Sequence, residues 1–173
     1  MMKFGIFLTA FLSITMSSCK SSEAADFKES LHQSERRAFD IILGKEGSGE
    51  KKLKCLEKED YKGAIMAVNQ QSKEFDVLIA NIKKLSTEGI SKGDSLKTAS
   101  IEYYQSLKEL HAFDRKEIEQ QALIKTLKND ELKNAQDKLL ALAKQKKTLY
   151  NAVYEKEALL YTTNEAFEAA NGF

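Results

Sequence analysis

Residues 94–171 read DSLKTASIEYYQSLKELHAFDRKEIEQQALIKTLKNDELKNAQDKLLALAKQKKTLYNAVYEKEALLYTTNEAFEAAN and contain neither glycine nor proline. These two residues most often interrupt helices, so the stretch predicts long α-helices. One helix of these 78 residues would be about 117 Å long, which is too long for a single compact domain. We therefore expect a turn at Lys128-Asn129-Asp130, where Asn129 tolerates a left-handed C-cap and Asp130 can cap the next helix.

Apolar residues in this stretch recur at steps of three, four or seven, as on one face of a helix. After the expected turn they form a near-heptad stripe of Leu132, Ala135, Leu139, Leu142, Leu149, Val153, Leu160 and Phe167. Before the turn the corresponding positions are Leu96, Tyr103, Leu107, Leu110, Leu123 and Leu127, and Asp94-Ser95 offers an N-cap. The pattern predicts two helices that each bury one face.

Two glycine clusters, at residues 44–49 and 89–93, divide the rest of the chain. Before the first cluster, Phe27, Leu31, Ala38 and Ile41 fit a helix near residues 24–43. Between the clusters, an apolar stripe opens with Leu53 and Leu56 and continues through Ala64, Val68, Phe75, Leu78, Ile82 and Leu85. Asp60, close to Gly63, indicates a break or kink in this second segment.

Four long helices with short connections favour an all-α fold, an antiparallel four-helix bundle over residues 27–171. The chain has no proline and is 42% hydrophobic, which suits long helices around one core. The alternative architecture is a helical hairpin or coiled coil that completes its core by dimerising. We therefore expect a monomer or a homodimer.

The N-terminus has the pattern of a lipoprotein signal peptide over residues 1–18. Lys3 is followed by an almost wholly apolar run, residues 4–15, which is shorter than the roughly 20 residues that span a bilayer. Met16-Ser-Ser-Cys19 then resembles a bacterial lipobox, in which Cys19 is lipidated and becomes the first residue. An ordinary secretory signal with a chance cysteine is the alternative. Residues 19–26 would form a lipid-anchored polar tether.

Lipidation of Cys19 would hold the chain on a membrane through its acyl chains. Lys20 stands where inner-membrane retention would need an aspartate, so we expect an outer-membrane lipoprotein of the cell envelope, facing the periplasm or the cell surface. Cys55 is then the remaining thiol, either a small buried hydrophobe or the site of an intermolecular disulfide.

The charge balance argues against nucleic-acid binding. Lysine plus arginine number 27 against 26 acidic residues, only three of the basic residues being arginine, whereas nucleic-acid-binding domains are usually basic. Lys125 to Lys147 is locally basic and residues 150–173 are locally acidic. This asymmetry would orient the bundle near an anionic surface, or it is ordinary pairing between helices.

No constellation of catalytic residues stands out, and we expect no enzyme, no metal and no cofactor. Glu29 and His32 have the Glu-x-x-His spacing of di-iron bundles, but Lys108 stands three residues before His111, so the second motif is missing. Tyr150, Tyr154 and Tyr161 share one helical face. They form either a binding face for a protein or glycan partner or the edge of the core.

The whole chain resembles a family of helical surface lipoproteins of leptospires and Bacteroidota. The resemblance lies in Phe113-Asp-Arg-Lys-Glu-Ile118, Leu132-Lys-Asn-Ala-Gln136 and Asn164-Glu-Ala-Phe167. It implies a bundle in the periplasm or on the surface and carries no catalytic residues. We expect a lipid-anchored envelope protein with a non-catalytic bundle for binding or spacing. The alternatives are a ferritin-like metal-binding bundle and a self-associating structural protein.

Overall fold

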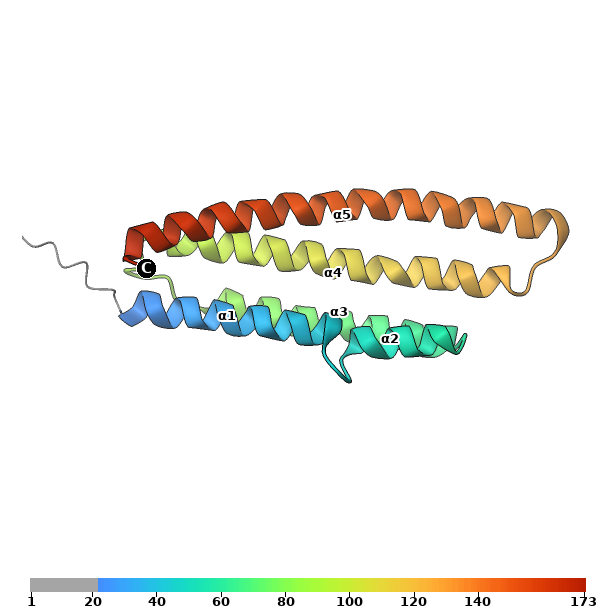
Figure 1. Cartoon of the computed structure of the whole chain (residues 1–173), viewed down its shortest axis with the longest axis horizontal. Coiled ribbons are helices and arrows are strands. Elements are labelled where there is room, and N and C mark those ends of the chain that lie inside the picture. Colours follow the sequence, from blue (N-terminus) through green and yellow to red (C-terminus); the bar gives the residue numbers. More distant parts are fainter. Residues whose placement is uncertain (1–21) are drawn as a thin grey trace, which may run out of the picture.

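The computed structural model describes residues 22–173 and consists of helices joined by short loops (Figure 1). The helices are α1 (Ser22–Leu43), α2 (Ser48–Glu57), α3 (Tyr61–Lys84), α4 (Gly93–Ile124) and α5 (Asn129–Asn171). The predicted signal peptide and Cys19 lie outside the described residues. Within residues 22–173, none of the helices combines the length and apolar character needed to cross a membrane.

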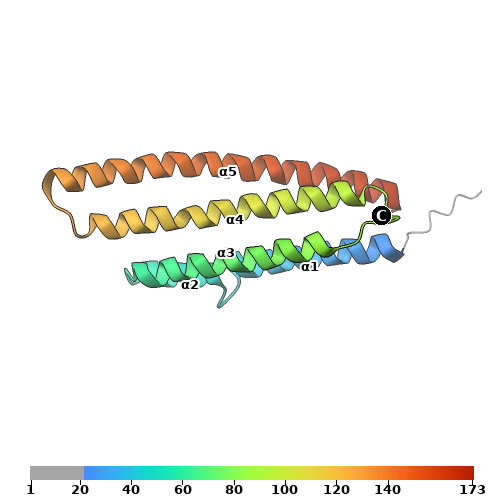
Figure 2. The ribbon, with the colours of Figure 1, turned by 180° about the vertical axis from the view of Figure 1, so that it is seen from behind.

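The helices form an elongated antiparallel bundle, which confirms the predicted all-α fold. Helices α1 and α2 follow one another in the same direction and together make one member of the bundle (Figures 1 and 2). Helix α3 runs back beside them, α4 returns, and α5 runs back along α4. The start of α1 and the end of α5 therefore lie at the same end of the molecule, and the α4–α5 turn lies at the other.

Helix α1 begins earlier than predicted. Residues 22–26, expected in the polar tether, form its first turns. Ala24 is fully buried and Phe27 nearly so, in a cluster with Ile90, Leu96 and Phe167. Burial of this apolar face holds the segment in a helix, so α1 includes residues 22–26 of the predicted tether.

The break between α1 and α2 depends on close backbone approach. A Cβ at Gly47 would lie 2.3 Å from Asp40 O, and one at Gly49 would lie 2.1 Å from Ile42 O. Only glycine fits both positions without displacing backbone. Ser48 Oγ donates to Ile41 O at 3.3 Å, which satisfies a carbonyl at the end of α1.

The predicted break near Asp60 is confirmed as a full separation between α2 and α3. The Asp60 side chain accepts a hydrogen bond from Gly63 N at 2.9 Å and caps α3. The predicted stripe is displaced in α2, because Leu53 is 55% exposed while Lys52 is buried. Lys52 turns inward because it pairs with Asp114 of α4.

Helix α4 begins at Gly93, one residue before the predicted cap. Lys92 precedes it in a left-handed conformation with φ of 59°. Asp94 lies in the first turn and accepts a hydrogen bond from Thr87 Oγ1 of the preceding loop. The turn predicted at Lys128-Asn129-Asp130 lies slightly earlier, over residues 125–128, because α4 ends at Ile124 and α5 begins at Asn129. Asn129 has φ of 53°, and Lys128 rather than Asp130 stands at the N-cap of α5.

The core follows the predicted stripes. Every position of the α5 stripe is buried or half-buried, and Phe167 is fully buried. The largest buried cluster joins four helices: Ala38, Ile41, Phe75, Leu78, Ile79, Ile82, Tyr104, Leu107, Leu110 and Val153. Leu123 departs from the prediction and is 44% exposed. The α4–α5 end extends beyond α2 and α3, so no third helix from residues 22–173 covers it there (Figure 1).

Candidate functional site

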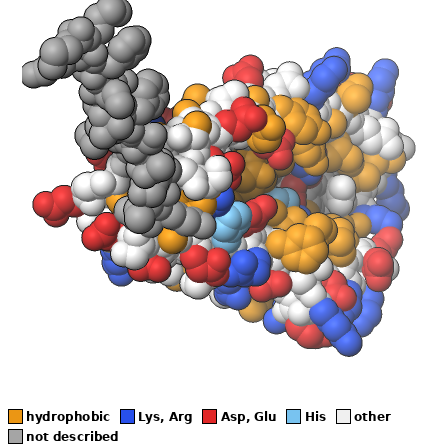
Figure 3. Space-filling view, turned by 60° about the vertical axis from the view of Figure 1, so that its left-hand side comes forward, with side chains coloured by type: hydrophobic (Ala, Val, Ile, Leu, Met, Phe, Trp, Pro, Cys, Tyr) orange, Lys and Arg blue, Asp and Glu red, His pale blue; other side chains and the backbone are white. Residues whose placement is uncertain are grey.

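An open groove lies between α1 and α5, with α4 as its floor. Its cavity volume is about 450 Å³, within the range of small-molecule pockets. Figure 3 shows hydrophobic side chains gathered around a hollow on this side of the molecule. Its lining is more apolar than that of the smaller hollows near Gly44 and near Ser30.

The groove exists because α1 and α5 are held together at one end and separated further along. At that end the rings of Phe27 and Phe167 lie 5.7 Å apart, and Lys28 Nζ lies 2.7 Å from Glu168 Oε1. Beyond this point α5 packs along α4, while α1 packs against α3. The side of the bundle between α1 and α5 is thus left open.

The lining is mostly apolar. Helix α1 contributes Leu31, Ala38, Phe39, Ile42 and Leu43, helix α4 contributes Leu96, Tyr103, Tyr104 and Leu107, and α5 contributes Leu160 and Tyr161. Phe39, Leu43 and Tyr161 stand at the rim and are 60%, 66% and 64% exposed. Large exposed apolar side chains grouped beside a cavity mark a binding site more often than isolated ones do.

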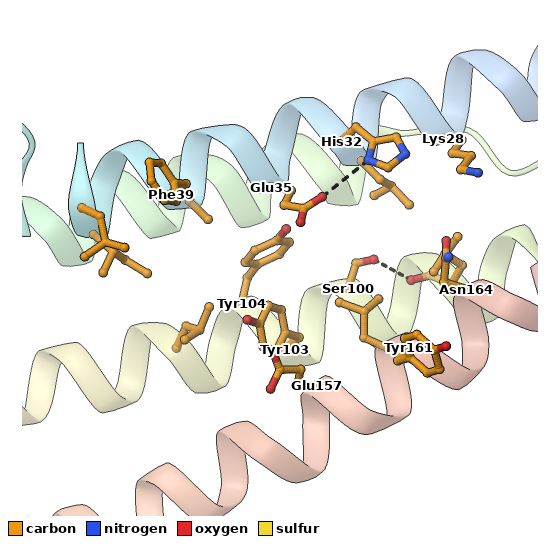
Figure 4. Close-up of a pocket in the computed structure, with 17 residues that line it drawn as sticks. Lys28, His32, Glu35, Phe39, Ser100, Tyr103, Tyr104, Glu157, Tyr161 and Asn164 are labelled. Carbon is orange, nitrogen blue, oxygen red and sulfur yellow. Dashed lines mark hydrogen bonds and ion pairs between the residues drawn. The ribbon is translucent and has the colours of Figure 1, made fainter. Parts of the chain in front are cut away.

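Polar groups occupy one end and the middle of the groove (Figure 4). Lys28, His32, Ser100 and Asn164 lie toward the end where α1 begins, and Glu35 and Glu157 lie near its middle. His32 Nδ1 is 3.5 Å from Glu35 Oε2. The far end is lined by side chains without polar atoms. The groove therefore has a polar and an apolar end.

The floor tyrosines are held in their neutral form. Burial, reinforced by the Glu35 carboxylate, raises the pKa of Tyr104 well above its usual value. Burial also raises the pKa of Tyr103, with a further contribution from Glu157. Neutral phenols give the floor an apolar character with hydroxyl groups that can donate or accept hydrogen bonds.

The three predicted tyrosines lie along the exposed side of α5. Tyr150 is 45% exposed, Tyr154 63% and Tyr161 64%. Tyr161 also lines the groove, which places the tyrosine face next to its rim. Sequence reasoning missed the groove itself. Phe39 and Leu43 lie outside the core stripe of α1. Large apolar residues outside such a stripe were the sequence feature that could have indicated a binding surface.

The two histidines lie in different surroundings. His32 is exposed on α1, and Glu29 of the Glu-x-x-His spacing accepts hydrogen bonds from Arg36 and Gln33. His111 stacks on Phe75 with ring centroids 6.1 Å apart. Burial, with help from the nearby Lys52 charge, lowers the pKa of His111 to about 4. Among residues 22–173, no three metal-ligating side chains come together.

A buried charge cluster, defined as Lys52, Asp114, Glu117 and Lys146, links α2, α4 and α5. Asp114 pairs with Lys52, and Lys146 Nζ lies 2.6 Å from Asp114 Oδ1 and 2.5 Å from Glu117 Oε2. Burial would raise the pKa of Asp114, but hydrogen bonds from Lys146 and Lys52 outweigh it and hold that pKa below its usual value. These groups satisfy one another, so the cluster is structural.

Cys55 and the lysine-rich segment both make contacts between helices. Cys55 is half-buried beside the cluster of Ala64, Val68 and Ile118, consistent with packing as a small hydrophobe. Within the lysine-rich segment, Lys146 pairs with the buried cluster and Lys125 Nζ lies 2.5 Å from Glu59 Oε1. Part of the positive charge of this segment therefore forms ion pairs between helices.

No family model, curated protein or solved structure matches the chain.

Proposed function

We propose that the protein is a lipid-anchored component of a bacterial cell envelope whose helical bundle binds an apolar ligand or partner and performs no catalysis. The observation that carries the binding role is the groove of about 450 Å³ between α1, α4 and α5. The lipobox-like Met16-Ser-Ser-Cys19 supports the anchor. Cys19 precedes the start of α1 by three residues, so the anchor would lie close to the polar end of the groove.

The shape of the bundle also supports a spacing role. Helix α5 has 43 residues, which corresponds to about 65 Å at 1.5 Å per residue. Because α1 begins at one end and the α4–α5 turn lies at the other (Figure 1), a bundle anchored at Cys19 would carry the turn away from the membrane. The exposed tyrosines of α5 would lie between the membrane and the α4–α5 turn.

The anchor is tested by metabolic labelling with an alkyne fatty acid in cells that express the full chain. The two cysteines provide a matched pair of variants. We expect Cys55→Ser to keep the label and Cys19→Ser to lose it and to leave the membrane fraction. Equal labelling of both variants, or a label lost only with Cys55, would overturn the anchor.

The side of the outer membrane is tested by protease treatment of intact cells, with a known periplasmic protein as the control. Digestion of residues 20–173 while the control survives would place the bundle on the cell surface. Protection until the membrane is opened would place it in the periplasm. Recovery in the cytoplasmic fraction would contradict the envelope assignment altogether.

A further inference from the structure

We infer that the groove binds the acyl chain of a free single-chain lipid, of which a long-chain fatty acid is the simplest form. The inference rests on the proposed function in one respect, because an anchored bundle would stand beside the membrane that supplies such a ligand. The acyl chains carried by Cys19 and a second copy of the protein are competing occupants. The experiment below separates them.

The dimensions of the groove fit one hydrocarbon chain. A cavity of about 150 Å³ accommodates the six-carbon ring of benzene, so 450 Å³ corresponds to on the order of 18 carbon-sized groups. The lining of α1 runs from Lys28 to Leu43, about 22 Å at 1.5 Å per residue. Volume divided by length gives a mean cross-section of about 20 Å² for the open space, a narrow passage that one extended chain can follow along its length.

The distribution of polarity matches an amphiphile with one head and one tail. At the apolar end of the groove, the lining side chains carry no polar atoms: Phe39, Ile42, Leu43 and Leu107. At the polar end, Lys28 Nζ already pairs with Glu168 Oε1 and the exposed His32 ring lies beside Glu35. The remaining N–H groups of the Lys28 ammonium and the His32 ring can still donate hydrogen bonds to a carboxylate head. The Glu35 and Glu157 carboxylates near the middle of the groove would repel an anionic head. The head is therefore expected at the polar end.

The rim supplies apolar area that a tail would cover. Phe39 and Leu43 of α1 and Tyr161 of α5 stand more than half exposed beside the cavity. Removing such surface from water stabilises a complex by about 25 cal/mol per Å². The chain outside the described residues joins the structure at Ser22, beside the polar end. That position places the head, rather than the tail, on the side of the proposed anchor.

The test uses the full chain in its own cells. Membrane and soluble fractions are incubated with a palmitic-acid analogue that carries a diazirine and an alkyne, irradiated, and digested so that labelled peptides can be located. Label that appears only after irradiation reports binding rather than enzymatic acylation, because the diazirine reacts only when it is irradiated. We expect adducts on peptides from residues 38–43 and 104–107, and we expect excess oleate to compete with them.

Two double variants decide the location. Phe39→Ser with Leu43→Ser should lower labelling at least roughly tenfold, because both contacts with the tail are lost. Met66→Ser with Val77→Ser changes two residues of α3 that are equally exposed, at 65% and 61%, and should leave labelling unchanged. All four positions are exposed, so both proteins should fold. Equal labelling of the two variants, or adducts spread over α3, would overturn the inference.

Two further outcomes would assign the groove to another occupant. If the groove is labelled only in the Cys19→Ser chain, the protein's own acyl chain fills it, and the inference of a free ligand fails. If irradiation yields chain-to-chain products instead of lipid adducts, a second copy fills it, and the inference fails equally. Labelling of the groove is measured in both the membrane and the soluble fraction. If Cys19 carries no lipid and the chain is found in the soluble fraction, the proposed anchor fails, but labelling of the groove can still be measured there.

Discussion

The ring of Phe27 near the start of α1 and the ring of Phe167 near the end of α5 lie 5.7 Å apart, in a tilted arrangement. Phe27 is 4% exposed and Phe167 is fully buried. The adjacent Lys28–Glu168 ion pair reinforces this contact. Two residues 140 positions apart in the sequence thus join α1 to α5 and fix the polar end of the groove.

Phe167→Ala should destabilise the protein by about 3–5 kcal/mol, because it removes a fully buried aromatic ring and leaves a cavity. Urea unfolding followed by circular dichroism measures this loss. Amide exchange over residues 22–31 should become faster. Phe39→Ala is the matched control, since Phe39 is 60% exposed, and it should cost less than about 1 kcal/mol. Similar losses from both would contradict the role of the Phe27–Phe167 contact.

Asp114→Asn should cost about 3 kcal/mol, because it leaves Lys52 buried without its counter-charge and weakens the hold on Lys146. Urea unfolding at neutral pH gives the value. The neighbouring Arg115→Gln removes an ion pair with Glu119 whose side chains are about half exposed, and it should change stability by less than about 1 kcal/mol. The idea of a structural charge cluster fails if the two variants lose stability equally.

Stability should fall as the pH drops from about 6.5 to about 4. Burial lowers the folded-state pKa of His111 from 6.5 to about 4, so within this window the unfolded state binds a proton that the folded state does not. The shift corresponds to a loss on the order of 3 kcal/mol by pH 4. His111→Phe should keep the stacking on Phe75 and flatten the dependence in this range, as followed by urea unfolding at several pH values.

Asp114 acts at lower pH and in the same direction. Its folded-state pKa lies below the ordinary value of 3.8, so its contribution to stability is present above that value and is lost as the pH falls through the folded-state pKa.

His32→Phe is the control for the His111→Phe variant, since His32 is exposed on α1. A slope between pH 6.5 and 4 that survives in His111→Phe and disappears in His32→Phe would contradict the assignment.

Changing Tyr150, Tyr154 and Tyr161 together to serine should leave the fold intact. All three side chains are at least 45% exposed, so the free energy of unfolding should shift by no more than about 1 kcal/mol. If they form a binding face, products of chemical crosslinking on intact cells should disappear in the triple variant and persist in Leu159→Ser. An unfolded triple variant, or unchanged crosslinking, would rule out the tyrosine face.

The sequence was sufficient for the helices, because their periodicity is strong and glycine clusters mark the α1–α2 and α3–α4 connections. The eight positions of the α5 stripe and the Asp60 break appear where expected, and the turn expected at Asn129 lies just before it. Errors arose where tertiary contacts override local pattern. Lys52 is buried because Asp114 is opposite it, and α1 begins at Ser22, slightly before the expected start, because Ala24 and Phe27 pack beside Phe167.

The candidate site was largely beyond sequence reasoning. Of the predicted tyrosines, Tyr161 lies on the groove, while Phe39, Tyr104 and Leu107 acquire their roles from the separation of α1 and α5. Periodicity indicates which face of each helix is apolar, but it does not give the distance between two helices. That distance is set by the Phe27–Phe167 contact at one end and by the packing of α1 on α3.

The same end contact has a mechanical consequence. A tensile load applied through Cys19 would enter the protein at Ser22 and reach Ala24, Phe27 and Lys28 first. These residues would be peeled from α5 one after another, and peeling breaks contacts sequentially rather than together. A pull at the proposed anchor would thus widen the groove from its polar end, and its direct transmission to α5 would end once the Phe27–Phe167 contact and the Lys28–Glu168 pair separate.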